Sequence, residues 1–169
     1  TTYFQNADVI FRFTFDKQWL KEQLPSVNLT ANYLASLISS EGAVGGAGYY
    51  VERPTRVEYD GVSQGHVVDA FRRLALLNSI AGDEASWKKY NGLADLVESY
   101  FRKKFWQGDQ YAEYRHPDKG FIAGHGLTDV DWTALATGIA SEEQKLILWP
   151  RLKNEAGFYY NRMPTGIAT

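Results

Sequence analysis

VSQGHVVDAFRRLALLNSIAGDEASWKKYNGLADLVESYFRKKF, residues 62–105, is the stretch that decides the fold class. Apolar side chains recur in it at intervals of three and four residues, which is the spacing of one face of an α-helix. Gly82-Asp83 interrupts the pattern, and so short a connection turns the chain back on itself. The stretch therefore predicts two helices, 62–81 and 84–105, that pack as an antiparallel hairpin.

Helical periodicity continues on both sides of this hairpin. Further helices are expected over 16–24, 29–39 and 132–140, and another from Ser141, where Ser141 and Gln144 have the spacing of a capping box. The first five residues are given no structural role. The sequence thus predicts an all-α chain with one domain over its whole length.

Two prolines and one long polar segment qualify this pattern. Pro25 is expected to end its helix and Pro150 to end or kink its own, because proline lacks the N–H that an interior helical position needs. Residues 106–126 are expected to form a loop, and a loop of that length in a compact domain is often functional.

Composition excludes several classes of function. The chain of 169 residues has 18 basic and 20 acidic side chains and a net charge of −2, so no bulk field attracts nucleic acid or an anionic membrane. No apolar run reaches the length of about 20 residues that spans a bilayer. Cysteine is absent, which excludes thiolate nucleophiles, disulfides and cysteine-based zinc sites but leaves the compartment open.

Two stretches resemble the six-hairpin glycosidase superfamily, whose members fold as an (α/α)6 barrel. They are GGAGYYVERPTRVEYDG, residues 45–61, and TDVDWTALATGIASEEQ, residues 128–144. The second is similar to a common element of that superfamily, in which an acidic loop runs into an Ala/Leu-rich helix and a new helix begins at Glu-Gln. The resemblance implies toroidally arranged antiparallel hairpins and a carbohydrate substrate.

The chain departs from that superfamily in the number of helices. An (α/α)6 barrel has about twelve helices, whereas the sequence predicts about six. The expectation is therefore a partial barrel, a fragment of a larger domain. Uncovered apolar helix faces would then be covered by the remainder of the barrel or by a homo-oligomer.

Carboxylates in the loops supply the chemistry that the resemblance implies. Glycoside hydrolysis uses a carboxylic acid and a second carboxylate, separated by about 5–5.5 Å in retaining enzymes and about 6.5–9.5 Å in inverting enzymes. The catalytic candidates, in order of preference, are Asp131, Glu58, Glu113 and Asp129. Asp129 and Asp131 have an equally simple alternative role as caps of the helix that follows them.

Aromatic, charged and histidine side chains in the same loops suit a sugar, because a sugar ring presents apolar C–H faces together with hydroxyls. The substrate-binding candidates are Arg56, Tyr59, Asp60, Trp106, Tyr114, His116, His125 and Trp132. Asp60 precedes Gly61, and capping the next helix is its simpler explanation. No histidine spacing matches a metal site, so we expect neither a metal nor another cofactor.

The leading hypothesis is a carbohydrate-active hydrolase or a fragment of one. Two alternatives remain open. A polysaccharide lyase would use Tyr59 or His116 as its base, with Arg56 near a uronate carboxylate. A helical carbohydrate-binding or scaffold domain would carry exposed aromatics and lack a complete catalytic pair.

Overall fold

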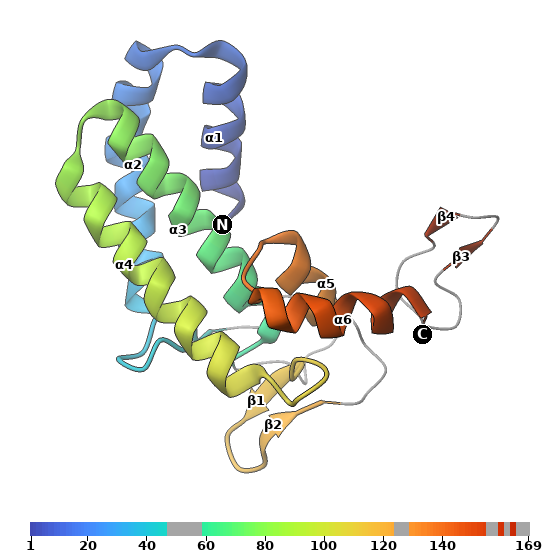
Figure 1. Cartoon of the computed structure of the whole chain (residues 1–169). Coiled ribbons are helices and arrows are strands. Elements are labelled where there is room, and N and C mark those ends of the chain that lie inside the picture. The colour runs from blue at the N-terminus through green and yellow to red at the C-terminus, as the bar shows by residue number, and fades with distance from the viewer. Residues whose placement is uncertain (47–58, 124–128, 155–158, 161–162, 165–169) are drawn as a thin grey trace.

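The computed structural model describes residues 1–46, 59–123, 129–154, 159–160 and 163–164. Helices dominate the described residues, which confirms the predicted all-α class (Figure 1). The elements, in chain order, are α1 (Thr2–Thr14), α2 (Lys17–Ser36), α3 (Gly61–Ala81), α4 (Glu84–Tyr100), a π-helical turn η1 (Phe101–Phe105), β1 (Tyr114–His116), β2 (Gly120–Ile122), α5 (Asp129–Ala136), α6 (Glu142–Asn154), β3 (Tyr159–Tyr160) and β4 (Met163–Pro164).

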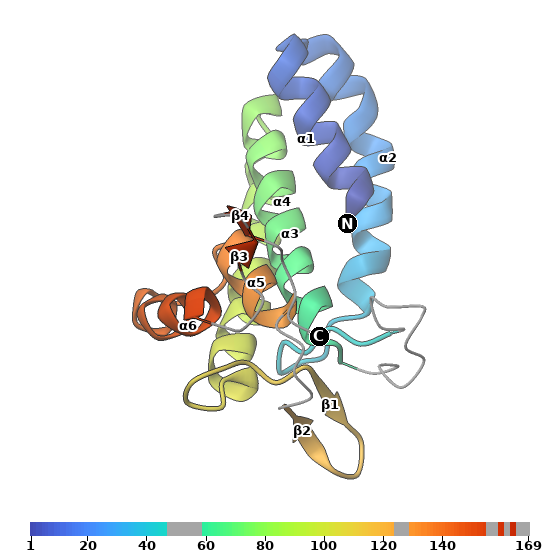
Figure 2. The same ribbon diagram turned by 90° about the vertical axis from the view of Figure 1, so that its right-hand side faces the viewer.

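Helices α3 and α4 form an antiparallel hairpin, as the sequence predicts. Asp60 caps α3, and Gly82 ends it with a φ of 87°, a left-handed conformation that glycine adopts without strain. Asp83 then caps α4 by accepting the Ser86 N–H. The two helices lie side by side, and Figure 2 shows the same hairpin turned by 90° (Figures 1 and 2). The rings of Phe71 and Tyr90 stack with their centroids 5.8 Å apart.

Helix α1 was not predicted, and the absence of a structural role for the first five residues is corrected here. Its buried residues recur at helical spacing, and they are Phe4, Ala7, Asp8 and Phe11. Phe15 ends the helix in the left-handed conformation, and Asp16 caps α2 by accepting the Trp19 N–H at 2.9 Å. The α1–α2 hairpin packs on α3.

Charged side chains join α1 to α3. The carboxylate of Asp8 is buried and accepts from Arg12 at 2.8 Å and from Arg73 at 2.5 Å. Arg73 also pairs with Asp69 at 2.8 Å, and Asp69 accepts from Gln5 at 3.0 Å. A buried carboxylate that receives two guanidinium groups is satisfied, which is the condition for placing it there.

Helix α2 is continuous, so the predicted end at Pro25 and the separate helices over 16–24 and 29–39 are wrong. The buried face runs through the proline without interruption, and it comprises Leu20, Leu24, Val27 and Ala31. Pro25 itself is exposed, and water can satisfy the carbonyl that would have received its N–H. Burial of the opposite face therefore outweighs the local cost of the proline.

Helix α6 also continues past an exposed proline. Its start is as predicted: Ser141 and Gln144 form a reciprocal capping box, with the Ser141 N–H donating to Gln144 Oε1 at 3.0 Å and the Gln144 N–H donating to Ser141 Oγ at 3.3 Å. The helix then continues past the exposed Pro150 to Asn154, so Pro150 does not end it. Helix α5 begins at Asp129, before the predicted segment 132–140, and ends at Ala136, before the predicted end at Ala140.

The segment expected to be a long loop contains a short antiparallel ribbon. Strands β1 and β2 pair in the register Tyr114 with Ile122 and His116 with Gly120. The Phe121 ring packs edge-on against the Phe105 ring, with centroids 5.1 Å apart, which attaches the ribbon to η1 at the end of α4. In the part of the chain that the structure describes, no helix is both long and apolar enough to cross a bilayer.

Candidate functional site

The N-terminus of α3 is the point at which the segments that carry the candidate carboxylates meet. A Cβ at Gly61 would lie 2.7 Å from Val130 Cγ1 and 2.8 Å from the Ala112 carbonyl oxygen, so three segments meet at this glycine. Acidic residues flank the contact on each segment, and all are buried: Asp60, Glu113, Asp129 and Asp131. Only a residue without a side chain permits so close an approach.

Backbone hydrogen bonds fix Glu113 in this position. Its carbonyl accepts from the Gly61 N–H at 2.8 Å, and its own N–H donates to the Ile122 carbonyl at 2.7 Å. Glu113 is therefore held between the first turn of α3 and the end of β2. The residue is 2% exposed, so it is enclosed by the protein.

Asp60 performs the simpler of the two roles considered for it. Its carboxylate accepts from the Val62 N–H at 3.2 Å and from Ser63 Oγ at 3.0 Å, which caps α3. A carboxylate at this end of a helix also complements the helix dipole. The substrate-binding role of Asp60 stays a prediction beside this structural one.

Asp131 is anchored by two donors. The Tyr111 N–H donates to Oδ1 at 2.8 Å, and the Arg151 guanidinium donates to Oδ2. One of the donors is a cation, so Asp131 and Arg151 form an ion pair beneath the surface. The sequence did not single out Arg151, because a cation in the last turn of α6 is ordinary and lies 20 residues from its partner.

Tyr111 is a second residue that sequence analysis missed. Its hydroxyl donates to Gln144 Oε1 at 2.6 Å, while its backbone N–H holds Asp131. The ring stacks on Phe101 at 4.3 Å, and burial raises the pKa of the Tyr111 hydroxyl above its ordinary value of about 10. Tyr111 thus connects Asp131 to the start of α6.

The aromatic and histidine candidates on or beside the ribbon each contact different neighbours. The Arg115 guanidinium lies over the Tyr59 ring, 5.3 Å from its centroid, in a cation–π contact. The backbone N–H of Arg115 donates to the Tyr59 carbonyl at 3.3 Å. His116 Nδ1 accepts from the Asp118 and Lys119 N–H groups and so closes the turn of the ribbon. Tyr114 lies in β1 and is partly buried.

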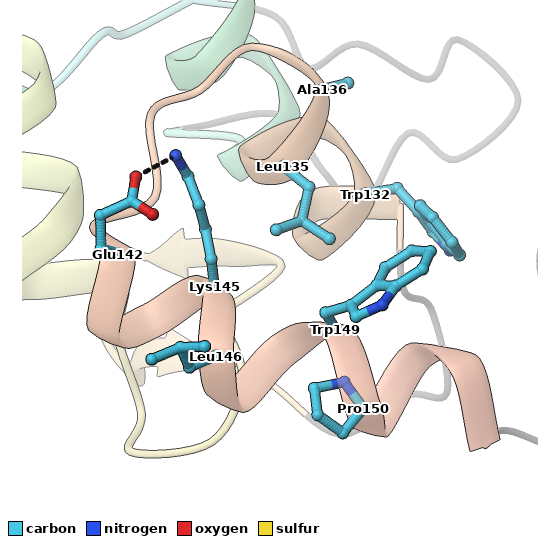
Figure 3. A pocket seen from close by; sticks show the side chains of 8 residues that line it. All are labelled: Trp132, Leu135, Ala136, Glu142, Lys145, Leu146, Trp149 and Pro150. Carbon is cyan, nitrogen blue, oxygen red and sulfur yellow. Dashed lines mark hydrogen bonds and ion pairs between the residues drawn. The ribbon is translucent and has the colours of Figure 1, made fainter.

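Two tryptophans contribute differently. Trp106 packs edge-on against Tyr111 at 5.0 Å as part of the core boundary. Trp132 faces a groove between α5 and α6, with a volume of about 560 Å³, where it meets Trp149 edge-on at 6.2 Å (Figure 3). The groove is lined by Trp132, Leu135, Ala136, Glu142, Lys145, Leu146, Trp149 and Pro150.

Three predicted site residues, Arg56, Glu58 and His125, lie outside the described residues. Among those that are described, no group of three or more His, Asp and Glu side chains is arranged to hold a metal ion.

The fold is shared with a solved structure. Over 91% of its length the chain matches the crystal structure of a GH78 family rhamnosidase of Bacillus sp. GL1, with a TM-score of 0.80 and 17% sequence identity. The chain spans 17% of the length of that structure. No protein-family model and no curated protein matches the sequence. At this identity the likeness concerns the fold, and it supports the resemblance to helical glycosidases at that level.

Proposed function

We propose that this chain belongs to a carbohydrate-active hydrolase that cleaves a glycosidic bond with paired carboxyl groups. The observation that carries the proposal is that the segments bearing Glu113, Asp129 and Asp131, all buried, meet at Gly61, in a fold shared with a glycoside hydrolase. Acid/base hydrolysis of a glycoside needs two carboxyl groups at one of the two catalytic separations, and segments that meet in this way could supply them.

The two carboxyl groups would divide the work according to their surroundings. Asp131, which receives the Tyr111 N–H and the Arg151 guanidinium, suits the ionised partner that accepts a proton from water or stabilises the developing cation. Glu113, buried beside the start of α3, suits the acid that protonates the departing oxygen. Water then adds to the anomeric carbon as the bond to the leaving group breaks.

Rhamnosides are the first substrates to test, because the matched structure is a rhamnosidase. The chain spans only part of that enzyme, so both substrate and activity are proposals for this chain. We also propose that its hairpins form a single domain of the partial-barrel type, which a single cooperative unfolding transition would support.

Release of the aryl alcohol from aryl rhamnosides and other aryl glycosides tests the proposed reaction. Asp131→Asn and Glu113→Gln should each lower kcat/KM by about 10²–10⁴-fold, the range for loss of a general acid or base. Asp95→Asn is the matched control, since Asp95 is an exposed carboxylate on α4 with 67% of its side chain accessible. Hydrolysis that survives both site variants would remove these residues from the catalytic role.

A non-catalytic carbohydrate-binding domain is the second candidate. One observation favours it: Asp60 and Asp131 already have structural partners, as a cap and as an anchor for Tyr111 and Arg151. Calorimetric titration with rhamnose and with oligosaccharides separates the two functions. Binding without turnover, unchanged by Glu113→Gln, would support the binding domain over the hydrolase.

A further inference from the structure

Helix α6 carries an exposed face of mixed apolar and charged character. The face, here named the α6 stripe, consists of Glu142, Leu146, Trp149 and Lys153. Successive members are four, three and four residues apart, so they lie along one side of the helix. Leu146 is 77% exposed and Trp149 is 49% exposed, which is unusual for two large apolar side chains one turn apart.

The stripe borders a groove that extends the apolar surface. Three of its members line the groove between α5 and α6, where Trp149 lies beside Trp132 of the neighbouring helix (Figure 3). Leu135 and Ala136 of α5 line the same groove. The apolar surface is therefore wider than one helix and concave, which suits an inserting side chain better than open water.

The stripe is complementary to itself. Its spacing is the same from either end, so an identical helix laid antiparallel on it places Leu146 opposite Trp149 and Glu142 opposite Lys153. Glu142 and Glu143 lie in the first turn of α6 and Arg151 and Lys153 in its last, so an antiparallel pair brings the acidic start of one helix to the basic end of the other, although Lys145 also lies near the start. A parallel pair would instead bring like charges together.

The charged residues near the stripe do not oppose this arrangement. Lys145 pairs with Glu142 at 2.7 Å within the helix, and a carboxylate accepts more than one donor. Arg151 is directed to Asp131 in the interior, so it does not compete with Lys153 for the partner's Glu142. Glu142 remains 83% exposed and within reach of another chain.

We propose that a second copy of this chain covers the α6 stripe, with the two α6 helices antiparallel about a two-fold axis. Each contact then occurs twice, as in any isologous interface, and the Leu146 and Trp149 side chains of each copy enter the groove of the other. The proposal does not depend on the proposed hydrolysis, because the stripe is distinct from the carboxylates at Gly61.

Sedimentation velocity over a protein concentration series tests the proposal. The chain should sediment as a dimer that dissociates on dilution, and Leu146→Asp should abolish the dimer because it buries a charge at the centre of the contact. Leu29→Asp is the matched control: Leu29 is an exposed leucine on α2, 73% accessible, and its change should leave the dimer intact. Circular dichroism verifies that both variants remain folded, as expected for exposed positions.

Charge exchange tests the antiparallel orientation. Glu142→Lys alone and Lys153→Glu alone should each weaken dimerisation roughly tenfold, since two like-charged contacts arise by symmetry. The double variant Glu142→Lys/Lys153→Glu restores opposite charges and should recover the affinity. A chain that is monomeric at every concentration would overturn the proposal and assign the stripe to another segment or partner. A dimer that persists in Leu146→Asp, or that the double variant does not restore, would equally overturn it.

Discussion

The α3–α4 hairpin and the α5–α6 pair differ in how far polar contacts add to apolar packing. In the hairpin, apolar side chains such as Phe71, Leu74 and Val97 are fully buried. The α5–α6 pair also buries apolar side chains such as Leu148, and directed hydrogen bonds from Tyr111 to Asp131 and to Gln144 add to its attachment. The outer surface of that pair leaves large apolar side chains exposed.

Apolar packing and polar contacts differ in how much of each can be predicted from the sequence. Apolar packing is non-directional and tolerates many sequences of the same pattern, so a hairpin built on it is visible as periodicity. Polar anchoring depends on particular atoms that lie far apart in the chain, and it positions the residues at the candidate site. The apolar region thus determines that the chain folds, and the polar region determines where the carboxylates lie.

Removal of an aromatic ring from the hairpin should have the largest effect. Phe71→Ala deletes a fully buried ring that stacks on Tyr90, and it should lower the free energy of unfolding by about 3–5 kcal/mol. Leu29→Ala, at an exposed position of α2, should change it by less than about 0.5 kcal/mol. Urea unfolding measures both. A cost below about 1 kcal/mol for Phe71→Ala would mean that the hairpin is not the stabilising core.

The second largest loss of stability is expected from a substitution at Gly61, where α3 meets α5. Gly61→Ala adds a Cβ that would lie 2.7 Å from Val130 Cγ1 and 2.8 Å from a backbone oxygen, so it should cost about 1–3 kcal/mol. Gly92→Ala, in α4 with no atom within 4 Å of the added Cβ, should instead stabilise by roughly 0.5–1 kcal/mol. Thermal unfolding compares them, and equal shifts of the same sign would refute the close approach at Gly61.

Loss of one polar anchor should have the smallest effect. Tyr111→Phe removes the hydrogen bond to Gln144 Oε1 but leaves the backbone bond to Asp131 and the Ser141 N–H on that oxygen, so a cost of about 0.5–1.5 kcal/mol is expected. Tyr33→Phe, on an exposed tyrosine of α2, provides the control. If calorimetry showed the same value for both variants, the Tyr111 hydroxyl would contribute nothing to the attachment of α6.

The sequence predicted the elements whose evidence is local. The two helices of the hairpin, the capping box at Ser141 and the turn at Gly82 all rest on residues within a few positions of one another. Helix α1 has the same periodicity in Phe4, Ala7 and Phe11, and it was missed because the first residues were given no weight.

The two prolines were misjudged because their effect depends on tertiary burial. Pro25 and Pro150 both lie on exposed faces, where water can replace the lost hydrogen bond while the opposite face remains packed. Sequence alone does not say which face of a helix will be buried against a distant segment. The predicted breaks were therefore local preferences that packing overrode.

The sequence singled out the carboxylates as candidates, which they remain, and it missed the residues that contact Asp131. Acidic residues beside turns and aromatics are visible in a sequence, which is how Glu113 and Asp131 were chosen. Tyr111 and Arg151 act on Asp131 across 20 residues in each direction, and no spacing pattern reports such a pair. Their roles follow only from the three-dimensional arrangement.

The π-helical turn η1 at the end of α4 accommodates an additional residue. A π turn holds one residue more than an α turn, and here it allows both Phe101 and Phe105 to be fully buried and stacked at 5.1 Å. Because the additional residue is taken up within one turn, deleting it would restore α geometry with little rotation of the chain beyond, whereas deleting a residue from the α-helical part of α4 would rotate that chain by about 100°. The contacts of Tyr111 and Glu113 should therefore tolerate a deletion within Phe101–Phe105 better than a deletion within Glu84–Tyr100.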